Sequence, residues 1–80
     1  MSELSQLRWR CRRGAKELDI VMNRYLDQLY TEAKPSQQAA FKELLLVEDP
    51  TIFDLLLERI DAQNEEQQIL LDTLRGIMAL

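Results

Sequence analysis

The sequence predicts an all-α protein, a compact bundle of five short helices with a single core. Three observations support this prediction. Apolar residues recur three or four positions apart in five successive stretches, helix-start signals separate these stretches, and no stretch alternates apolar and polar residues as a half-buried strand would. A chain of 80 residues has room for one small core, so we expect residues 1–80 to form a single helical domain.

The first helix is expected at about residues 3–13. The Ser2 hydroxyl is suited to cap it, because it can accept a hydrogen bond from a free backbone N–H of the first turn. Three apolar residues at helical spacing mark its inward side, namely Leu4, Leu7 and Cys11. Trp9 lies off this stripe. We expect Trp9 to pack under the second helix, and the alternative is a partly exposed anchor for a partner.

The second helix is expected at about residues 15–30, after Gly14 allows the chain to change direction. Glu17 and Asp19 lie in its first turns, where acidic side chains interact favourably with the positive end of the helix dipole. On a helical wheel drawn from residue 13, Gly14 falls on the packing side, where a missing side chain lets another backbone come close. The apolar residues on that side are Leu18, Val21, Met22, Tyr25, Leu26 and Leu29.

The opposite edge of the same wheel carries charges of both signs around one apolar residue. It consists of Arg13, Glu17, Ile20, Arg24 and Asp27. Arg13 and Glu17 are four residues apart and would share a helix face, although an exposed pair at this spacing is worth only about 0.2–0.5 kcal/mol. A face that only keeps a protein in solution does not need this mixture, so we interpret the edge as a candidate binding surface.

Proline and amide residues mark the starts of the third and fifth helices. The third, at about residues 35–47, begins with Pro35, whose missing N–H would be unpaired at a helix start in any case. The fifth, at about residues 65–78, is preceded by Asn64, which forms a plausible capping box with Gln67.

The fourth helix is expected at about residues 50–61. Asp49 is predicted to be its N-cap, because a carboxylate accepts the free N–H groups of a first turn, and Pro50 would occupy the first helical position. The residues that this helix is expected to bury are Ile52, Phe53, Leu56, Leu57 and Ile60.

Charge is distributed unevenly along the chain, although the net charge is only −4. Residues 1–24 contain six Lys/Arg and three Asp/Glu, whereas residues 25–80 contain four Lys/Arg and eleven Asp/Glu. The molecule should therefore present a basic end and an acidic end, which favours steering toward a charged surface of a partner.

Cysteine usage and hydropathy indicate the compartment. Cys11 is the only cysteine, and a lone thiol is typical of a reducing environment, where it usually serves as a small apolar residue. No secretory signal is recognisable, and no stretch approaches the roughly 20 apolar residues that a membrane span requires. We expect a bacterial cytoplasmic protein.

The usual catalytic arrangements are missing from the sequence. There is no histidine, no serine or cysteine beside a recognisable base, and no glycine-rich phosphate loop, so we expect neither an enzyme nor a stable cofactor or metal site. A nucleic-acid-binding module is a less favoured interpretation. Arg8, Arg12 and Lys16 repeat at i,i+4 as phosphate-neutralising residues do, but the remaining surface is acidic and no helix-turn-helix stands out.

Two segments resemble a known family. Arg13-Gly14-Ala15-Lys16-Glu17-Leu18-Asp19 is similar to the Arg-Gly-x-x-Glu-Leu-Asp signature of the succinate dehydrogenase assembly factors, which promote covalent attachment of FAD to the flavoprotein subunit. The resemblance continues through Leu44-Leu45 and Glu48-Asp49-Pro50-Thr51-Ile52-Phe53, and it spans about residues 5–78.

The resemblance implies a small helical factor that binds the apo flavoprotein subunit of succinate dehydrogenase and, in some members, that of fumarate reductase. FAD would be handled through the partner, on which it becomes joined to a histidine. A monomer without intrinsic catalysis is expected. The rival interpretation is an antitoxin-like regulator that binds a small membrane protein, because this description is attached to some relatives.

The residues expected to contact the partner come from the basic stretch and the start of the second helix. They are Arg8, Arg12, Arg13, Gly14, Lys16, Glu17, Asp19, Ile20 and Arg24. Arg13, Gly14 and Glu17 are expected to form the centre of the site, with Gly14 permitting close backbone approach and the two charges pairing across the interface.

Overall fold

The protein is a bundle of five α-helices and one π-helical segment around a single apolar core, and no strand is present in the part of the chain described, residues 2–79 of a computed structural model. The predicted all-α fold is therefore confirmed. The elements are α1 (Glu3–Arg10), α2 (Lys16–Tyr25), η1 (Leu26–Tyr30), α3 (Pro35–Leu44), α4 (Asp49–Leu56) and α5 (Glu65–Met78).

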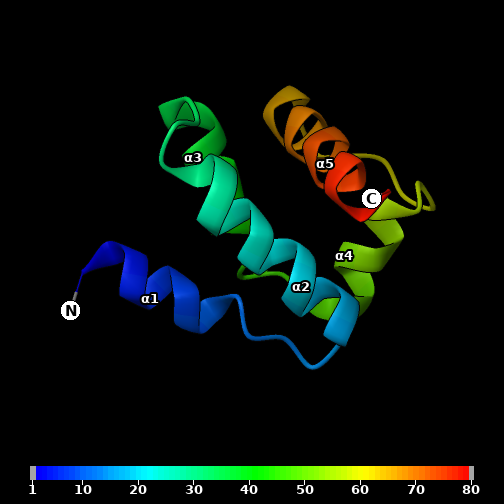
Figure 1. The fold of residues 1–80 in the computed structure, drawn as a ribbon. Helices are drawn as coiled ribbons and strands as arrows, with labels where there is room; N and C mark the ends of the chain where they lie inside the picture. Colours follow the sequence, from blue (N-terminus) through cyan, green and yellow to red (C-terminus); the bar gives the residue numbers. More distant parts are fainter. Residues whose placement is uncertain (1, 80) are drawn as a thin grey trace.

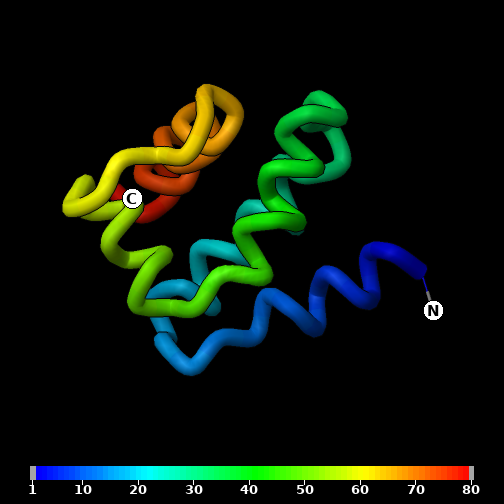
Figure 2. Tube along the Cα trace, turned by 180° about the vertical axis from the view of Figure 1, so that it is seen from behind, coloured from blue at the N-terminus to red at the C-terminus, as the bar shows by residue number. Residues whose placement is uncertain are grey.

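Helix α2 and its continuation η1 form the middle of the bundle. Helix α5 packs against α2, α3 and α4, while α1 lies on the other side of α2 from α5 (Figure 1). The view from behind shows the same order, with α1 running beneath α2 and α3 and joined to α2 by an extended loop (Figure 2). Helix α1 therefore packs on the outside of the bundle.

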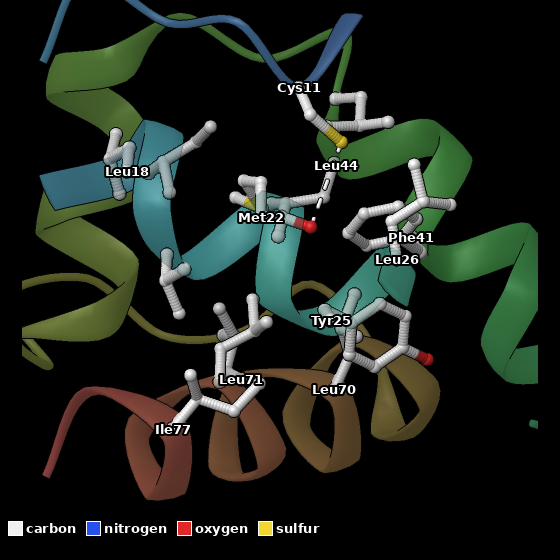
Figure 3. Close-up of a cluster of buried hydrophobic side chains, with 14 of the residues drawn as sticks. Cys11, Leu18, Met22, Tyr25, Leu26, Phe41, Leu44, Leu70, Leu71 and Ile77 are labelled. Carbon is white, nitrogen blue, oxygen red and sulfur yellow. Dashed lines mark hydrogen bonds between the residues drawn. The ribbon is translucent and has the colours of Figure 1, made fainter. Parts of the chain in front are cut away.

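The core is built from the apolar stripes of these helices (Figure 3). Phe41 is fully buried at its centre, with its ring 4.5 Å from that of Tyr25 and 5.7 Å from that of Tyr30. Leu18 and Met22 of α2 are also fully buried, as the wheel predicted. Burying one such side chain stabilises the fold by about 1.5–3 kcal/mol, so the helical stripes supply most of the driving force for folding.

Two predicted helix caps are confirmed. The Ser2 hydroxyl accepts a hydrogen bond from the Ser5 N–H at 3.2 Å. Asn64 accepts one from the Gln67 N–H at 2.8 Å, and the Gln67 side chain accepts one from the Gln63 N–H at 2.8 Å. The capping box therefore forms, but the Gln67 side chain accepts from the N–H of Gln63 instead of the N–H of the N-cap residue Asn64.

Three helices end earlier than the apolar pattern indicated. Helix α1 ends at Arg10 instead of residue 13, α3 at Leu44 instead of 47, and α4 at Leu56 instead of 61. After α4, Glu58 adopts a left-handed conformation with φ of 61°, and the Arg59 N–H bonds back to the Asp54 carbonyl at 2.8 Å. This is a Schellman-type helix end, so the chain turns away before residue 61.

The early end of α4 overturns part of its predicted core. Ile52 and Leu56 are buried as expected, but Leu57 and Ile60 are about half exposed, at 54% and 45%. They lie beyond the last helical turn, so helical periodicity no longer determines which side of the chain faces inward. Leu55 is buried in their place.

Trp9 does not pack under the second helix, so this prediction is wrong. Helix α1 turns Leu7 and Cys11 inward, and Trp9 lies about 200° around the helix from Leu7. Its side chain is 68% exposed, and the Arg12 guanidinium lies 5.3 Å from its ring centre, a cation–π arrangement. The alternative, an exposed aromatic residue available to a partner, describes its position.

Candidate partner-binding site

The loop of residues 11–15 joins α1 to α2 and carries the first half of the signature segment. Helix α2 begins at Lys16, so Arg13 and Gly14 precede it and do not share a helix face with Glu17. The wheel prediction for these two residues is therefore wrong. Gly14 is exposed and lies outside the core, contrary to its expected place on the packing side.

Gly14 is not required by the local fold. Its φ angle is not positive, and a Cβ added to it would meet nothing nearer than the Asp49 Oδ2 atom at 3.7 Å, an ordinary van der Waals contact. A side chain at this position would therefore point into available space. Neither the backbone conformation nor the packing within this chain therefore requires a glycine at this position.

Arg13 points into the protein. Its side chain is only 11% exposed. The guanidinium donates to the Leu45 carbonyl at 2.8 Å, the Val47 carbonyl at 2.5 Å and the Arg10 carbonyl at 3.3 Å, while Nε donates to Asp49 Oδ1 at 2.8 Å. Every nitrogen of the guanidinium thus has a partner within the fold. The expected ion pair between Arg13 and a partner protein is not available in this arrangement.

Asp49 does not cap α4 as the sequence predicted. It is the first residue of the helix, Glu48 occupies the N-cap position, and no side-chain cap bond forms there. The two Asp49 oxygens instead accept hydrogen bonds from Arg13 and from the Ala15 N–H, the latter at 3.1 Å. Burial alone would raise the pKa of Asp49, but these hydrogen bonds outweigh it and hold the pKa below its ordinary value.

We call this pair of residues with its hydrogen bonds the Arg13–Asp49 clamp. Local sequence patterns do not connect Asp49 with Arg13, because the two residues lie 36 positions apart. The only signal was that both segments carrying the family resemblance contain one member of the clamp.

The first turns of α2 present the second half of the signature. Lys16, Glu17 and Arg24 are exposed, and Ile20 is 45% exposed. Asp19 is half-buried and accepts a hydrogen bond from the Asn23 side chain at 2.8 Å, so it supports the helix from one side.

A shallow hollow of about 200 Å³ adjoins Glu17, between α2 and the end of α5. The residues that line it are Glu17, Ile20, Val21, Arg24, Ile77 and Met78. Its floor is apolar, and Glu17 and Arg24 contribute opposite charges one on each side of Ile20 along the helix. Such a hollow suits an apolar side chain flanked by charged groups.

The basic residues divide into two groups. Arg8 donates to the Asn23 side chain at 3.0 Å and forms an ion pair with Asp27, so it joins α1 to α2. Arg13 belongs to the clamp. In contrast, Arg12, Lys16 and Arg24 form no ion pair with any residue that the structure describes.

Cys11 behaves as the small apolar residue that was predicted. It is fully buried, and its thiol lies 3.7 Å from the Met22 carbonyl oxygen, to which it donates a weak hydrogen bond (Figure 3). Burial raises its pKa to about 11, so the thiol stays protonated and unreactive at neutral pH.

The fold and the site together define a small all-helical protein with an exposed glycine in a loop beside a mixed-charge helix face. No helix within residues 2–79 is both long and apolar enough to span a bilayer. Over residues 5–78, the sequence matches the family described as the flavinator of succinate dehydrogenase, and the chain belongs to this family.

Curated relatives carry a name consistent with that family. The FAD assembly factor SdhE of Idiomarina loihiensis is 35% identical over 66 residues, which are 82% of this chain and 73% of the relative. The FAD assembly factor SdhE of Coxiella burnetii is 33% identical over 61 residues, 76% of this chain and 74% of the relative. That of Xylella fastidiosa strain Temecula1 is 33% identical over 78 residues, 98% of this chain and 80% of the relative.

Proposed function

We propose that this protein is an FAD assembly factor, which binds the apo flavoprotein subunit of succinate dehydrogenase and promotes covalent attachment of FAD to it. Membership of the flavinator family supports the partner. The proposed binding site is supported by one observation: Gly14 is exposed, and the fold itself does not require a glycine there. The fumarate reductase flavoprotein is proposed as a second client.

The proposed docking surface combines the loop with the exposed face of α2. It consists of Arg12, Gly14, Lys16, Glu17, Ile20 and Arg24. Gly14 would allow the partner's backbone to come close, Glu17 and the cations would pair with opposite charges, and Ile20 would offer apolar contact in the hollow. Arg8, Arg13 and Asp19 would support this surface, because each is hydrogen-bonded to another side chain of this protein.

The proposed role is that of a chaperone, and the bond-forming chemistry belongs to the partner and its flavin. This chain has no histidine, the residue type to which FAD becomes joined on the family's partner. Docking would hold the partner in an arrangement where its own histidine and the flavin meet, a proximity effect supplied from outside. We propose that the protein acts as a monomer in the bacterial cytoplasm and binds no flavin stably on its own.

The two other interpretations gain no support. Each relative reported above is an FAD assembly factor, and none is an antitoxin. The phosphate-binding stripe of Arg8, Arg12 and Lys16 does not form, because α1 ends at Arg10 and Arg8 is paired with Asp27.

Replacing Gly14 with arginine tests the proposal. Gly14→Arg should leave the fold intact, because the position is exposed, yet a large side chain would block close approach of the partner. In cells that lack the native protein, we expect this variant to fail to restore covalent flavin on the flavoprotein subunit, measured as flavin fluorescence of the denatured band on a gel.

Gly76→Arg is the matched control. Gly76 is also exposed, and a Cβ there would meet nothing within 4 Å, but it lies in α5 and belongs neither to the signature segment nor to the residues that line the hollow. This variant should restore flavinylation to the wild-type level. Full flavinylation with Gly14→Arg, or normal flavinylation in the deletion strain, would contradict the proposed function.

A further inference from the structure

We propose that Asp49 is a positioning residue for partner binding, which holds the loop of residues 11–15 so that Gly14 and Glu17 are presented together to the flavoprotein. The inference rests on the proposed function and deepens it. It assigns a role in docking to a side chain from α4, which is distant in sequence from the signature segment, and it places Arg13 behind the surface.

One carboxylate, that of Asp49, accepts hydrogen bonds from the residues on both sides of Gly14. Asp49 Oδ1 accepts from the Arg13 Nε at 2.8 Å, and Oδ2 accepts from the Ala15 N–H at 3.1 Å. Arg13 and Ala15 are the residues immediately before and after Gly14. A single side chain therefore holds both neighbours of the exposed glycine and so restrains the position of the glycine itself.

At the start of α2, Asp49 supplies the acceptor for a backbone N–H group. Ala15 is the N-cap residue of α2, and alanine has no side-chain acceptor with which to cap the helix. The carboxylate of Asp49 satisfies the Ala15 N–H that would otherwise lack a partner at this helix start. Without Asp49, the start of α2 would lose this bond and Gly14 would lose a fixed orientation relative to Glu17.

Arg13 connects the loop to the corner between α3 and α4. Its bonds to the Leu45 and Val47 carbonyls join residues more than 30 positions apart in the sequence. Within the clamp, Arg13 therefore links the loop to this corner through three hydrogen bonds. A preorganised surface binds more tightly than a mobile one, because less conformational freedom is lost on association.

Arg75 provides a matched comparison within the same molecule. It donates to the Leu56 carbonyl at 2.8 Å and the Leu55 carbonyl at 3.0 Å, and it pairs with Asp72 at 2.6 Å. It thus fastens the end of α4 as Arg13 fastens the end of α3, but it touches no residue of the loop. Loss of Arg75 should cost stability without disturbing the docking surface.

The experiment compares Asp49→Asn and Asp49→Ala with Arg75→Ala and Gly14→Arg. Affinity for the purified apo flavoprotein is measured by calorimetry at a temperature where circular dichroism shows each variant fully folded. We expect both alanine variants to lower the melting temperature, but only Asp49→Ala to weaken binding, by at least about tenfold. Asp49→Asn retains an oxygen for the Ala15 N–H and should fall between wild type and Asp49→Ala, which keeps the test valid if the alanine variant does not fold.

A second measurement needs no partner. Amide hydrogen exchange at Ala15 should accelerate in Asp49→Asn and stay unchanged in Arg75→Ala, because only the first change removes or weakens the bond to this N–H. Combining Arg13→Ala with Asp49→Ala should weaken binding by less than the sum of the two single effects, since the two side chains share one hydrogen bond.

The outcomes separate this inference from the proposed function. Wild-type affinity in Asp49→Ala, together with lost binding in Gly14→Arg, would overturn the positioning role and leave the proposed function standing. Equal weakening by Arg75→Ala and Asp49→Ala would show a general effect of stability and would also overturn it. If the wild-type protein does not bind the apo flavoprotein, the proposed function fails and this inference fails with it.

Discussion

At the scale of single residues, burial separates side chains that were similar in the sequence. Arg12 and Arg13 are adjacent, yet Arg12 lies on the surface over Trp9 and Arg13 is held inside by four acceptors. Glu17 is exposed and forms no ion pair with the residues described here. Of the three residues expected at the centre of the site, Gly14 and Glu17 therefore remain available for contact.

Glu17 is predicted to be a charged anchor of the complex. We expect Glu17→Ala to weaken binding to the apo flavoprotein by about 2–5 kcal/mol, the range for removing one partner of a buried, hydrogen-bonded charge pair. Calorimetric titration measures this change. Glu65→Ala serves as the control, because Glu65 is likewise exposed in the first turn of a helix but lies outside the docking surface. Equal affinities for the two variants would exclude Glu17 as an anchor.

At the scale of the helices, their ends are set by arginine side chains from other elements. Arg13 occupies carbonyls just past the end of α3, and Arg75 occupies the last carbonyls of α4. A free carbonyl at a helix C-terminus needs a donor, and a guanidinium supplies several in a fixed geometry. Both arginines therefore satisfy carbonyl groups at or just beyond helix ends that lie before the apolar pattern of these sequences stops.

The turn after α4 contains a strained position that a substitution should relieve. Glu58 has a φ of 61°, a conformation that glycine adopts without steric cost. We expect Glu58→Gly to stabilise the protein by about 1 kcal/mol, which corresponds to a rise of about 4–8 °C in melting temperature for a domain of this size. Thermal unfolding followed by circular dichroism measures the change.

The control for this prediction is Glu58→Ala. It removes the same carboxylate, whose contact with Arg75 is long at 3.8 Å and largely exposed, but it keeps the Cβ that causes the strain. It should not raise the melting temperature. A similar rise in both variants would attribute the effect to the lost charge instead of the backbone conformation.

At the scale of the whole molecule, polar contacts attach α1 to the rest of the bundle. Helix α1 lies on the opposite side of α2 from α5 (Figure 1). Glu3 pairs with Lys42 of α3 and accepts a hydrogen bond from the Tyr30 hydroxyl at 3.1 Å. Arg8 pairs with Asp27. Leu7 and Cys11 add the apolar contact beneath. The clamp follows shortly after α1, so each of the three ion pairs between the first 15 residues and the bundle contains a carboxylate, namely Glu3, Asp27 or Asp49.

Acid should therefore destabilise the protein partly through Asp49. Its pKa in the folded protein is lowered, whereas an aspartate in the unfolded chain titrates near pH 3.9. A lowered folded-state pKa gives stability that is fully present above the unfolded-state value and is lost as pH falls through the folded-state value. We expect the free energy of unfolding to fall between about pH 5 and pH 2 more steeply in the wild type than in Asp49→Asn.

Urea unfolding at pH 6, 4 and 3 measures this difference. Glu3→Gln is the comparison variant, because the hydrogen bonds from Lys42 and Tyr30 also lower the pKa of Glu3, but this carboxylate is exposed to solvent. Its removal should change the slope less than removal of Asp49. Parallel pH profiles for the wild type and Asp49→Asn would show that the clamp does not contribute to acid sensitivity.

Much of the fold could be read from the sequence because it depends on local patterns. The fully buried Leu18, Met22 and Phe41 follow from apolar spacing within a single helix, and the Ser2 and Asn64 caps follow from residues three positions apart. The family resemblance likewise singled out Gly14 as a candidate contact residue. The helical wheel, however, placed Gly14 on the packing side, whereas it is exposed.

The direction of Arg13, the role of Asp49, the exposure of Trp9 and the early helix ends were decided only by the tertiary structure. Each of these depends on contacts between segments far apart in the chain or on which side of a helix its neighbours cover. Helical periodicity describes one segment at a time, so it predicts which residues of a helix face the core. It contains no information on which arginine reaches which carbonyl, because only the packing of the loop of residues 11–15 against the corner between α3 and α4 brings those groups together.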